Sequence, residues 1–453
     1  MFIFLIIRRT QAIMNRTPIG SLKDHLDQVV TIQGWLQILR DQKKMQFLIL
    51  RDRTGLVQVA NYRPANPELS DRISTLGIES ALTITGKVVK NDVVKLGGLE
   101  IQLQDLKVEN NAEAPLPFDP FDNENLPAID FRMDWRYLDL RRRQNLILFR
   151  AQTLLEHAMR EYWLQEGFME IHSPKMMGSP SESGAELFEV DYFGGKAYLA
   201  QSPQFYKQMA MAAGFERVFE VGPVFRADPS FTSRHMTEFT GLDMEMSWIE
   251  THEDVMAFTE HWLQYACKRV KEQMGDEIKE TFVVDIVVPE VPFPRMTMSE
   301  VYVILKQAGY QLPPERKGDL DPGGERAIAD HVKQKTGSDF LFIIDWPIAV
   351  RPFYHMRHPD KPELTRSFDL IAGGLEIATG AQREHRYEIL KKQALEKGLG
   401  LENIKFYLDF FRYGCPPHGG FGMGLSRLAM VLLDIKNIRE SVYLFRGPNR
   451  LNP

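Results

Sequence analysis

Short runs in which apolar and polar residues partly alternate dominate the chain from Ser21 to about Asn110. Alternation with a period of two is typical of strands that bury one face. One helical segment, PELSDRISTLG, lies between the third and the fourth run. Five strands with a helix after the third predict an OB-fold, a small barrel that binds oligonucleotides. The five runs are VVTIQGWLQIL, MQFLILRD, LVQVA, SALTITGKVV and LEIQLQDLKV.

Two residues of this region could contact a nucleic acid. Phe47 and Gln58 lie on consecutive runs. On a hairpin they would face one groove, where Phe47 stacks on a base and Gln58 hydrogen-bonds to a base edge. The alternative is that Phe47 belongs to the core and Gln58 to the surface, and the pattern alone favours this alternative.

The pattern changes after the β-rich region. Glu113 to Ile129 is rich in proline and acids, which predicts an ordered linker. The basic segment from Asp130 to Arg143 then either touches a nucleic-acid backbone or caps and salt-bridges a helix. From Asn145 to Gln165, apolar residues recur at three- and four-residue steps, which predicts a long amphipathic helix that ends at Gly167.

The remaining chain alternates between helical and extended patterns. Glu250 to about Asp339 is helical and charged, apart from the β-like stretch FVVDIVVPEVPFPRM. LFIIDWP is a buried strand, and two or three further strands follow between Arg351 and Arg386. We therefore predict an α+β protein. Its predicted segments are a disordered extension over 1–18, an OB-fold domain over 19–110, a linker over 111–143 and a second domain over 144–453.

The first residues, MFIFLIIRR, are apolar, but the run from Met1 to Ile7 is well short of the roughly 20 residues that span a bilayer. Arginines follow the run and no small-residue cleavage site is present, which argues against a secretory signal. We interpret the segment as an upstream start ahead of Met14 or a disordered tail. The alternative is a membrane or organelle-targeting role. No other stretch is a transmembrane candidate, so we expect no membrane association.

Composition narrows these expectations. The 453 residues predict two or three domains, and 44% apolar with 26% charged residues is ordinary for a globular protein. A net charge of −6 means that any nucleic-acid contact depends on local basic patches. Cys267 and Cys415 lack metal-site spacing and cannot form a disulfide framework, which favours a reducing, cytoplasmic location.

The stretch from Val224 to Ile249 carries the strongest chemical signal. It is typical of a strand, a polar loop and a second strand. This arrangement would place Arg226, Arg234, His235 and Asp243 on one sheet surface. Three cations with an acid beside them suit a polyphosphate and an amino group. The alternative is a surface loop of solvated charges.

Two segments before this stretch could contribute to the same site. Ser179 to Glu189 is a small-residue, acidic loop from which Glu182 and Glu186 could reach a ligand ammonium, unless it is a plain surface loop. Ser202 and Pro203 form a good helix start. Gln204 and Lys207 would then share one face of the first turn. Lys207 could hold an anion there, although a solvated lysine is the more ordinary interpretation.

Two later segments add oxygen ligands and further arginines. Asp369 and Glu376 flank a Gly-Gly turn, with Thr379 beyond them, and such oxygens can hold Mg²⁺ on a nucleotide phosphate. Arg383 adds a fork for a carboxylate. FRYGCPPHGGFGMGLSRLAMVLLD predicts a strand, a Gly-rich turn and a helix that carries Arg427. It lacks the GKS or GKT of a Walker sequence and is a weak signal by itself.

In this order, the segments resemble the class II aminoacyl-tRNA synthetases, and more narrowly the aspartyl-tRNA synthetases of the archaeal/eukaryotic type. The resemblance covers about Ile19 to Pro453. The three signature motifs fall at Gly167–Pro174, Val224–Ile249 and Gly420–Arg427. The narrower match rests on AQSPQFYKQ, GPVFRA, FDL with GLEIATGAQREHR, YGCPPHGGFGMG and RLNP.

The resemblance implies a catalytic domain with an antiparallel sheet flanked by helices, and a homodimer formed through the first motif. It implies ATP with Mg²⁺, L-aspartate and tRNA(Asp) as ligands, and Phe47 and Gln58 as the anticodon-reading pair. For ATP, it implies Arg226 as a catalytic residue on the α-phosphate and Arg427 as a catalytic residue near the β/γ end. The remaining ATP-binding residues implied by the resemblance are Asp228, Arg234, His235 and Glu376.

For the metal and the amino acid, the resemblance again implies particular residues. Lys207 and Arg383 would hold the aspartate side chain, and Glu182 would lie on a loop that closes over it. The implied magnesium residues are Asp369, Glu376 and Thr379. The implied aspartate pocket is Glu182, Gln204, Lys207, Asp243, Thr379 and Arg383.

The sequence departs from the family pattern at several positions. Asp228 stands where a glutamate is usual, Ser426 replaces an acid, Thr379 replaces a serine, and LFRGP replaces an FPRD-like segment. An active enzyme is favoured, because the pocket and the phosphate arginines are intact. Three alternatives stay open: an enzyme that also charges tRNA(Asn) with aspartate, an asparagine enzyme, and a non-catalytic RNA-binding paralogue. Lys207 would be a poor partner for the neutral amide of asparagine.

Overall fold

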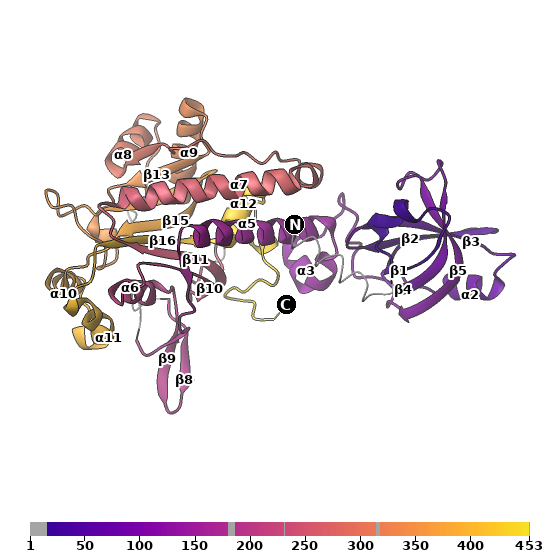
Figure 1. Ribbon diagram of the computed structural model, residues 1–453, viewed down its shortest axis with the longest axis horizontal. Helices are drawn as coiled ribbons and strands as arrows, with labels where there is room; N and C mark the ends of the chain where they lie inside the picture. Colours follow the sequence, from indigo (N-terminus) through magenta and orange to yellow (C-terminus); the bar gives the residue numbers. More distant parts are fainter. Residues whose placement is uncertain (1–15, 180–185, 231, 314–317, 453) are drawn as a thin grey trace. The chain divides into compact units, whose positions relative to one another are not determined.

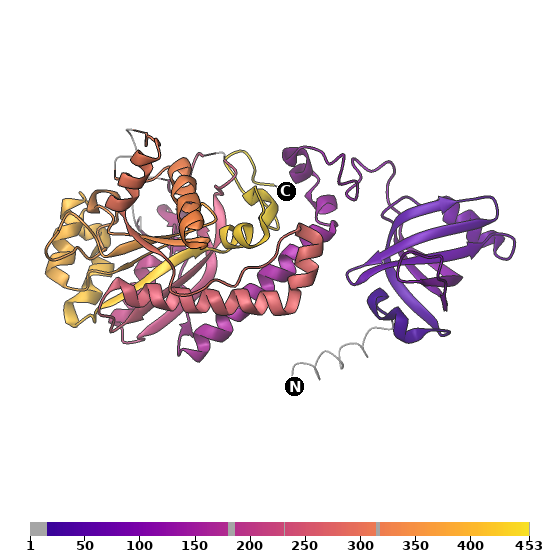
Figure 2. The same ribbon diagram turned by 90° about the horizontal axis from the view of Figure 1, so that it is seen from above.

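The computed structural model describes residues 16–179, 186–230, 232–313 and 318–452. The chain divides into two compact units, Met1–Pro127 and Ala128–Pro453, and each is described by itself (Figures 1 and 2). Most of the extension predicted over 1–18 lies outside the described residues. No helix in the described part of the chain is long and apolar enough to cross a membrane.

The first unit is a closed five-stranded barrel with the strand order β1-β2-β3-β5-β4, which confirms the predicted OB-fold. Alternate residues such as Leu48, Leu50 and Val59 point into its apolar core. Its elements are η1 (Ile19–His25), β1 (Val29–Asp41), β2 (Met45–Asp52), β3 (Gly55–Tyr62), α2 (Pro67–Ser74), β4 (Ala81–Lys90) and β5 (Leu99–Asn110). The helix α2 follows the third strand, as the sequence predicted.

The second unit is built on an eight-stranded sheet with the order β12-β13-β14-β15-β16-β11-β10-β6. Its inner strands from β13 to β10 are antiparallel to their neighbours, whereas the edge strands β12 and β6 run parallel to theirs. The strands are β6 (Met169–Glu170), β10 (Arg217–Phe225), β11 (Glu238–Ser247), β12 (Arg295–Thr297), β13 (Phe340–Ile344), β14 (Ser367–Ala372), β15 (Leu375–Gln382) and β16 (His418–Gly424). A separate three-stranded sheet contains β7 (Met176–Met177), β8 (Glu189–Tyr192) and β9 (Gly195–Leu199).

Helices cover one face of the large sheet. Figure 1 shows α5, α7 and α12 alongside one another across the sheet. Trp163 of α5 lies in the core between them, with its ring 5.5 Å from that of Trp262 and 6.0 Å from that of Phe421. The helices are α3 (Ile129–Asp134), α4 (Arg136–Asp139), α5 (Arg143–Gln165), α6 (Gln204–Ala212), α7 (His252–Phe282), α8 (Met298–Gln307), α9 (Pro322–Thr336), α10 (Tyr387–Glu396), α11 (Lys405–Leu408) and α12 (Leu425–Leu433). Short 3-10 turns are η3 (Ile348–Val350), η4 (Leu401–Ile404), η5 (Asp409–Tyr413) and η6 (Ile438–Ser441).

Strand alternation separates this core from a polar face. On β11, Leu242 and Met244 belong to the core under the helices, so Asp243 and Glu245 point to the opposite face. The predicted amphipathic helix is α5, and Gly167, with φ of +81°, follows its end. The sheet therefore carries apolar side chains toward the helices and buried acids toward the other side.

Three local predictions need correction. HGGFGMG is the central strand β16, not a Gly-rich turn. A Cβ at Gly420 would lie 2.0 Å from the Met244 carbonyl oxygen, so only glycine lets β16 pass β11 there. Helix α6 begins at Gln204, because Pro203 is its N-cap residue and Ser202 precedes it. Of the β-like stretch FVVDIVVPEVPFPRM, only the end, in β12, becomes a strand.

The basic segment before α5 forms ion pairs within its own unit. Arg132 Nη1 lies 3.0 Å from Asp139 Oδ1, and Arg136 pairs with the other oxygen of the same carboxylate. Asp139 is fully buried. The contacts fit the salt-bridging interpretation of this segment.

Candidate active site

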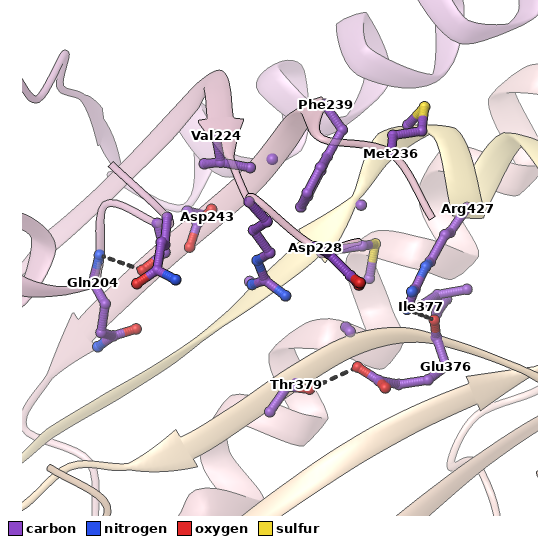
Figure 3. A pocket seen from close by; sticks show the side chains of 18 of the residues that line it. Gln204, Val224, Asp228, Met236, Phe239, Asp243, Glu376, Ile377, Thr379 and Arg427 are labelled. Carbon is purple, nitrogen blue, oxygen red and sulfur yellow. Dashed lines mark hydrogen bonds between the residues drawn. The ribbon is translucent and has the colours of Figure 1, made fainter. Parts of the chain in front are cut away.

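A cavity of about 410 Å³ opens on the sheet face that bears Asp243 (Figure 3). It collects residues from α6, from the loop between β10 and β11, from β15 and from α12. Most of the residues singled out in the sequence therefore meet in one place. Those that line the cavity are Gln204, Arg226, Asp228, Arg234, His235, Asp243, Glu376, Thr379, Arg383 and Arg427.

Five predicted residues do not line this cavity, and one of them, Lys207, is described below. Asp369 lines a smaller cavity of about 150 Å³, which also includes Arg234, His235, Glu376 and Arg427. Because those four side chains line both cavities, the two spaces adjoin. Three further positions lie apart: Glu182 falls outside the described residues, and Phe47 and Gln58 belong to the barrel unit.

One end of the large cavity carries arginines with few acidic partners. Arg226 directly follows β10, its side chain is exposed, and its guanidinium carbon lies 5.6 Å from the centre of the Phe239 ring. Arg427 Nη1 donates a hydrogen bond of 2.8 Å to the Glu376 carbonyl oxygen. Within the described residues, neither guanidinium forms an ion pair with a carboxylate. Their charge is therefore available to an anion in the cavity.

The loop between β10 and β11 brings an acid and a histidine to the same end. Asp228 Oδ1 accepts a hydrogen bond of 2.8 Å from the Ser230 amide, and Asp228 Oδ2 lies 3.8 Å from His235 Nε2. Burial raises the pKa of Asp228, but the Ser230 hydrogen bonds together with the charges of His235 and Arg226 leave it below its usual value. Burial lowers the pKa of His235. The departure from glutamate at Asp228 thus leaves an ionised carboxylate in the cavity, and Figure 3 shows it there.

The opposite end of the cavity is built from a buried arginine. Arg383, only 2% exposed, donates from Nε to Glu245 Oε1 over 2.9 Å and from Nη2 to the Gly420 carbonyl oxygen over 2.9 Å. Arg383 Nη1 lies 3.1 Å from His355 Nε2. Burial opposes the charge of Arg383, but Glu245 raises its pKa above the usual value. The guanidinium is therefore charged, fixed in orientation and still on the cavity wall.

Lys207 differs from its predicted placement. Its ammonium donates to Asp243 Oδ1 over 2.9 Å, to the Phe421 carbonyl oxygen over 2.8 Å and to the Met244 carbonyl oxygen over 3.3 Å. These contacts use all three donors, and the side chain is not among those that line the cavity. Gln204 lines the cavity and Lys207 does not, so the two do not present one shared face. In this structure Lys207 reaches the cavity only through Asp243.

Two carboxylates of the adjoining strands suit a magnesium ion. Asp369 of β14 pairs directly with Thr379 of β15 in the sheet register, and Thr379 Oγ1 donates to Glu376 Oε1 over 2.9 Å. Asp369 Oδ2 lies 2.7 Å from Arg351 Nη2, while Oδ1 is buried without a donor in the described chain. Burial and then the charge of Glu376 raise the pKa of Asp369 to about 7.

Those two carboxylates do not make a complete metal cage. No group of three or more His, Cys, Asp or Glu side chains that could hold a metal occurs in the part of the chain described. Mg²⁺ usually takes one or two carboxylates and completes its octahedron with waters and substrate phosphates. The orphaned oxygen of Asp369 and the carboxylate of Glu376 fit that partial donor set.

The barrel unit presents its predicted pair on one face. Phe47 pairs with Ala60, and Gln58 pairs with Ile49, two positions further along the hairpin. Both side chains therefore point away from the core that holds Leu48, and Phe47 is half-buried on the outside. Gln58 Nε2 donates to Glu100 Oε2 over 2.9 Å. Phe47 and Gln58 therefore share one outer face of the barrel, and Phe47 does not belong to the barrel core.

Several site residues were not singled out from the sequence. Glu245 lies two positions after Asp243 on one strand, and this spacing could have revealed it, because such residues share a sheet face. Arg351 and Glu325 come from distant segments with no local pattern. Their roles depend on ion pairs with Asp369 and Arg234 that only the folded chain creates.

Comparisons with known proteins agree with this geometry. The family model described as tRNA synthetases class II (D, K and N) matches residues 128–446, and the model of the OB-fold nucleic acid binding domain matches residues 30–109. An aspartate–tRNA(Asp/Asn) ligase from Aeropyrum pernix is 41% identical over 94% of this chain and 95% of its own. An aspartate–tRNA(Asp) ligase from Pyrococcus abyssi is 41% identical over 94% of this chain and 96% of its own. The crystal structure of asparaginyl-tRNA synthetase from Pyrococcus horikoshii with asparaginyl-adenylate superposes with a TM-score of 0.89 and 30% identity, covering 97% of this chain and 100% of that one.

Proposed function

The chain belongs to the class II tRNA synthetases (D, K and N), and we propose that it is an aspartate–tRNA ligase. It activates L-aspartate with ATP and transfers the aspartyl group to tRNA(Asp). One observation carries this proposal: relatives that match nearly the whole chain at 41% identity are aspartate–tRNA ligases. The cavity then supplies the chemistry, since it joins a buried arginine at one end to unpaired arginines at the other.

Activation brings two anions together, because a carboxylate of the amino acid attacks the α-phosphate of ATP. The main tasks are to neutralise charge and to align the reacting groups, so no protein base is needed. Arg226, at the cavity wall beside Phe239, binds the α-phosphate. His235 and Arg427 bind the β- and γ-phosphates, with Asp228 and Arg234 in the same ATP site.

ATP is the nucleotide of this family, generally together with Mg²⁺. When bound, Mg²⁺ neutralises phosphate charge. Asp369 and Glu376 would hold it, and the Thr379 hydroxyl orients Glu376 through its hydrogen bond. Burial raises the pKa of Asp369 to about 7 although Arg351 lies beside it, so a second cation at this carboxyl would favour its ionised form.

Aspartate is selected at the buried end of the cavity. Arg383 receives the side-chain carboxylate, with Gln204 and Asp243 in the pocket and Thr379 beside it. Lys207 supports this end through its ion pair with Asp243. Asparagine has the same shape but would leave the buried Arg383 without an added anion. A polar site can reject such an isostere by about 10⁴-fold.

The second step is attack of the terminal ribose hydroxyl of tRNA on the aspartyl adenylate. Phe47 and Gln58, side by side on the outer face of the barrel, read the anticodon. A second candidate function is aspartylation of tRNA(Asn) as well, since the relative from Aeropyrum pernix acts on tRNA(Asp/Asn). An asparagine–tRNA ligase and a non-catalytic paralogue rank lower.

Aminoacylation of purified tRNA(Asp) and tRNA(Asn), each with aspartate and with asparagine, tests the function. We expect aspartyl-tRNA(Asp) as the principal product. Additional aspartyl-tRNA(Asn) selects the second candidate. Asparaginyl-tRNA as the only product, or no product at all, contradicts the proposal.

Assembly, domain limits and location belong to the same proposal. A homodimer forms through the first motif, where β6 is an edge strand and the nearby Leu164 and Met169 are 57% and 45% exposed. The barrel domain spans 19–110, the linker 111–143 and the catalytic domain 144–453. The enzyme works in the cytoplasm. Sedimentation would reveal a monomer if the dimer is wrong, and cell fractionation tests the location.

A further inference from the structure

The inserted segment between the second and third motifs reaches the ATP site. It contains α8 and α9, and Glu325 lies in the first turn of α9. Glu325 lines the smaller cavity together with Arg234, His235 and Arg427. We propose that Glu325 is a positioning residue, which fixes Arg234 where the terminal phosphates of ATP bind. This role rests on the proposed function, because it assigns those phosphates to this end of the cavity.

The contact between the two residues is direct. Arg234 Nη2 donates to Glu325 Oε2 over 2.7 Å, and the side chains are only 15% and 9% exposed. Arg234 belongs to the loop between β10 and β11, and it lines both cavities, whereas Glu325 lines only the smaller one. A loop arginine has many rotamers, and an ion pair shielded from water restricts them. Glu325 therefore holds a flexible cation at the boundary of the two spaces.

Glu325 itself is held by the helix that carries it. Asp321 caps α9 by accepting a hydrogen bond of 2.9 Å from the Gly324 amide, and the Tyr310 hydroxyl donates to the same carboxylate over 2.8 Å. Further along α9, Ile328 and Val332 are buried in a cluster with residues of β13. A capped helix anchored in a core is a rigid support, so the position of the Glu325 backbone is set by the inserted segment.

The sign of the charge argues against a direct contact between Glu325 and the phosphates of ATP. A carboxylate facing a triphosphate would repel it, so Glu325 can favour ATP only through a cation. Arg234 is the cation it contacts. The same Glu325 oxygen lies 3.4 Å from the Glu376 amide, which places the pair beside a carboxylate proposed to hold magnesium. The inserted helix is thereby connected to the phosphate end of the cavity.

A double-mutant cycle tests this role. Arg234→Ala, Glu325→Ala and the double variant are compared with the unmodified protein. The readouts are the Kd of MgATP by calorimetry and the KM for ATP in aspartate-dependent pyrophosphate exchange. Each single change should raise the Kd of MgATP by about tenfold, because a hydrogen bond to a charged group is lost. The Kd of MgATP for the double variant should lie within about twofold of that for Arg234→Ala, because Glu325 acts only through Arg234.

Several results would overturn the role. One is a Kd of MgATP in the double variant that rises by the product of the two single effects. Another is a lower Kd of MgATP in Glu325→Ala. A third is a rise in the KM for aspartate as large as that for ATP. Glu325→Gln keeps the hydrogen-bond acceptor and removes the charge, so it should recover part of the ATP affinity. If MgATP binding shows the coupling while the unmodified protein lacks aspartate-dependent exchange, the proposed function fails and the positioning role stands.

Glu260 provides a matched control. It is a buried glutamate that accepts a hydrogen bond of 2.9 Å from the Phe293 amide and lies 3.2 Å from Arg295 Nη2. It lines neither cavity. Glu260→Gln should lower the melting temperature and leave the MgATP affinity unchanged. If Glu260→Gln and Glu325→Gln lose the same ATP affinity, Glu325 contributes only to the stability of the fold and does not position Arg234.

Discussion

The two ends of the large cavity both carry cationic side chains, but these differ in burial and in pairing with acids. At the carboxylate end, defined by Lys207, Asp243, Glu245 and Arg383, every cation is buried and already paired with an acid. At the phosphate end, defined by Arg226, Asp228, His235 and Arg427, the arginines are exposed or half-buried. Neither of these arginines pairs with a carboxylate in the described chain.

This difference suggests separate roles for the two ends: the carboxylate end would select the amino acid, and the phosphate end would attract the polyphosphate. The carboxylate end is preorganised, so a bound amino acid meets groups whose orientation is set before it arrives. A neutral isostere would there gain no charge-assisted hydrogen bond from the Arg383 guanidinium. The phosphate end instead holds unpaired arginines, whose charge the proposed polyphosphate would neutralise. Substitution of the paired Arg383 should therefore cost stability as well as activity, whereas substitution of Arg226, which has no ion-pair partner in the described residues, should cost activity alone.

The largest effect is expected from Arg383→Ala. It removes the proposed partner of the aspartate carboxylate and leaves Glu245 buried without its arginine. Aspartate-dependent pyrophosphate exchange should fall by about 10⁴-fold. The free energy of unfolding should drop by about 3 kcal/mol, since an uncompensated buried charge remains. Denaturant unfolding and exchange kinetics measure the two losses, and a variant of unchanged stability would break the contrast between the ends.

Arg226→Ala should reduce exchange by about 10³-fold, because one preorganised cation at the reacting phosphate is lost. Its stability should match that of the unmodified protein, since the side chain is exposed and has no ion-pair partner in the described residues. Thermal unfolding provides the control. Near-normal adenylate formation in this variant would remove Arg226 from the catalytic assignment.

Phe47→Ala changes a side chain of the barrel unit that lines neither end of the cavity, so it separates effects on tRNA from effects on ATP and the amino acid. We expect the KM for tRNA(Asp) to rise by about tenfold, as one base loses its aromatic stacking partner. Amino-acid-dependent exchange without tRNA should stay unchanged. Gln58→Ala changes the other side chain on the same face of the barrel and offers a second variant. A rise in the KM for ATP would show that Phe47 acts on more than tRNA.

The smallest effect is expected from Asp228→Glu, which restores the longer acid usual in the family. The shorter side chain is already ionised and hydrogen-bonded to Ser230, so the KM for ATP should change by about threefold at most. Exchange kinetics at varied ATP measure it. A large gain of activity would mean that Asp228 marks a weakened ATP site.

The two ends also differ in how well the sequence predicted them. Arg226, Asp228 and His235 could be grouped from the sequence because they lie in one loop between two strands, β10 and β11. The carboxylate end was identified only in part. Lys207 lies on the predicted helix but not on the predicted face, because its partner carbonyl at Phe421 comes from a strand far along the chain.

Strand pairing explains the other differences. HGGFGMG looked like a turn because glycine is common in turns, yet its glycines serve close packing between β16 and β11. The barrel was predicted in outline because its five strands, and the helix after the third, stand as separate and partly alternating runs in the sequence. The ion pair of Arg234 with Glu325 had no sequence signal, because only the packing of the inserted helix brings the residues together.

Pyrophosphate exchange by the unmodified protein, with aspartate and asparagine compared at saturating MgATP, tests most directly whether the carboxylate end selects the amino acid. Aspartate should support exchange, and asparagine should give a kcat/KM lower by about 10⁴-fold. Exchange with asparagine equal to or faster than with aspartate would contradict the assignment of the paired, buried Arg383 to the aspartate carboxylate.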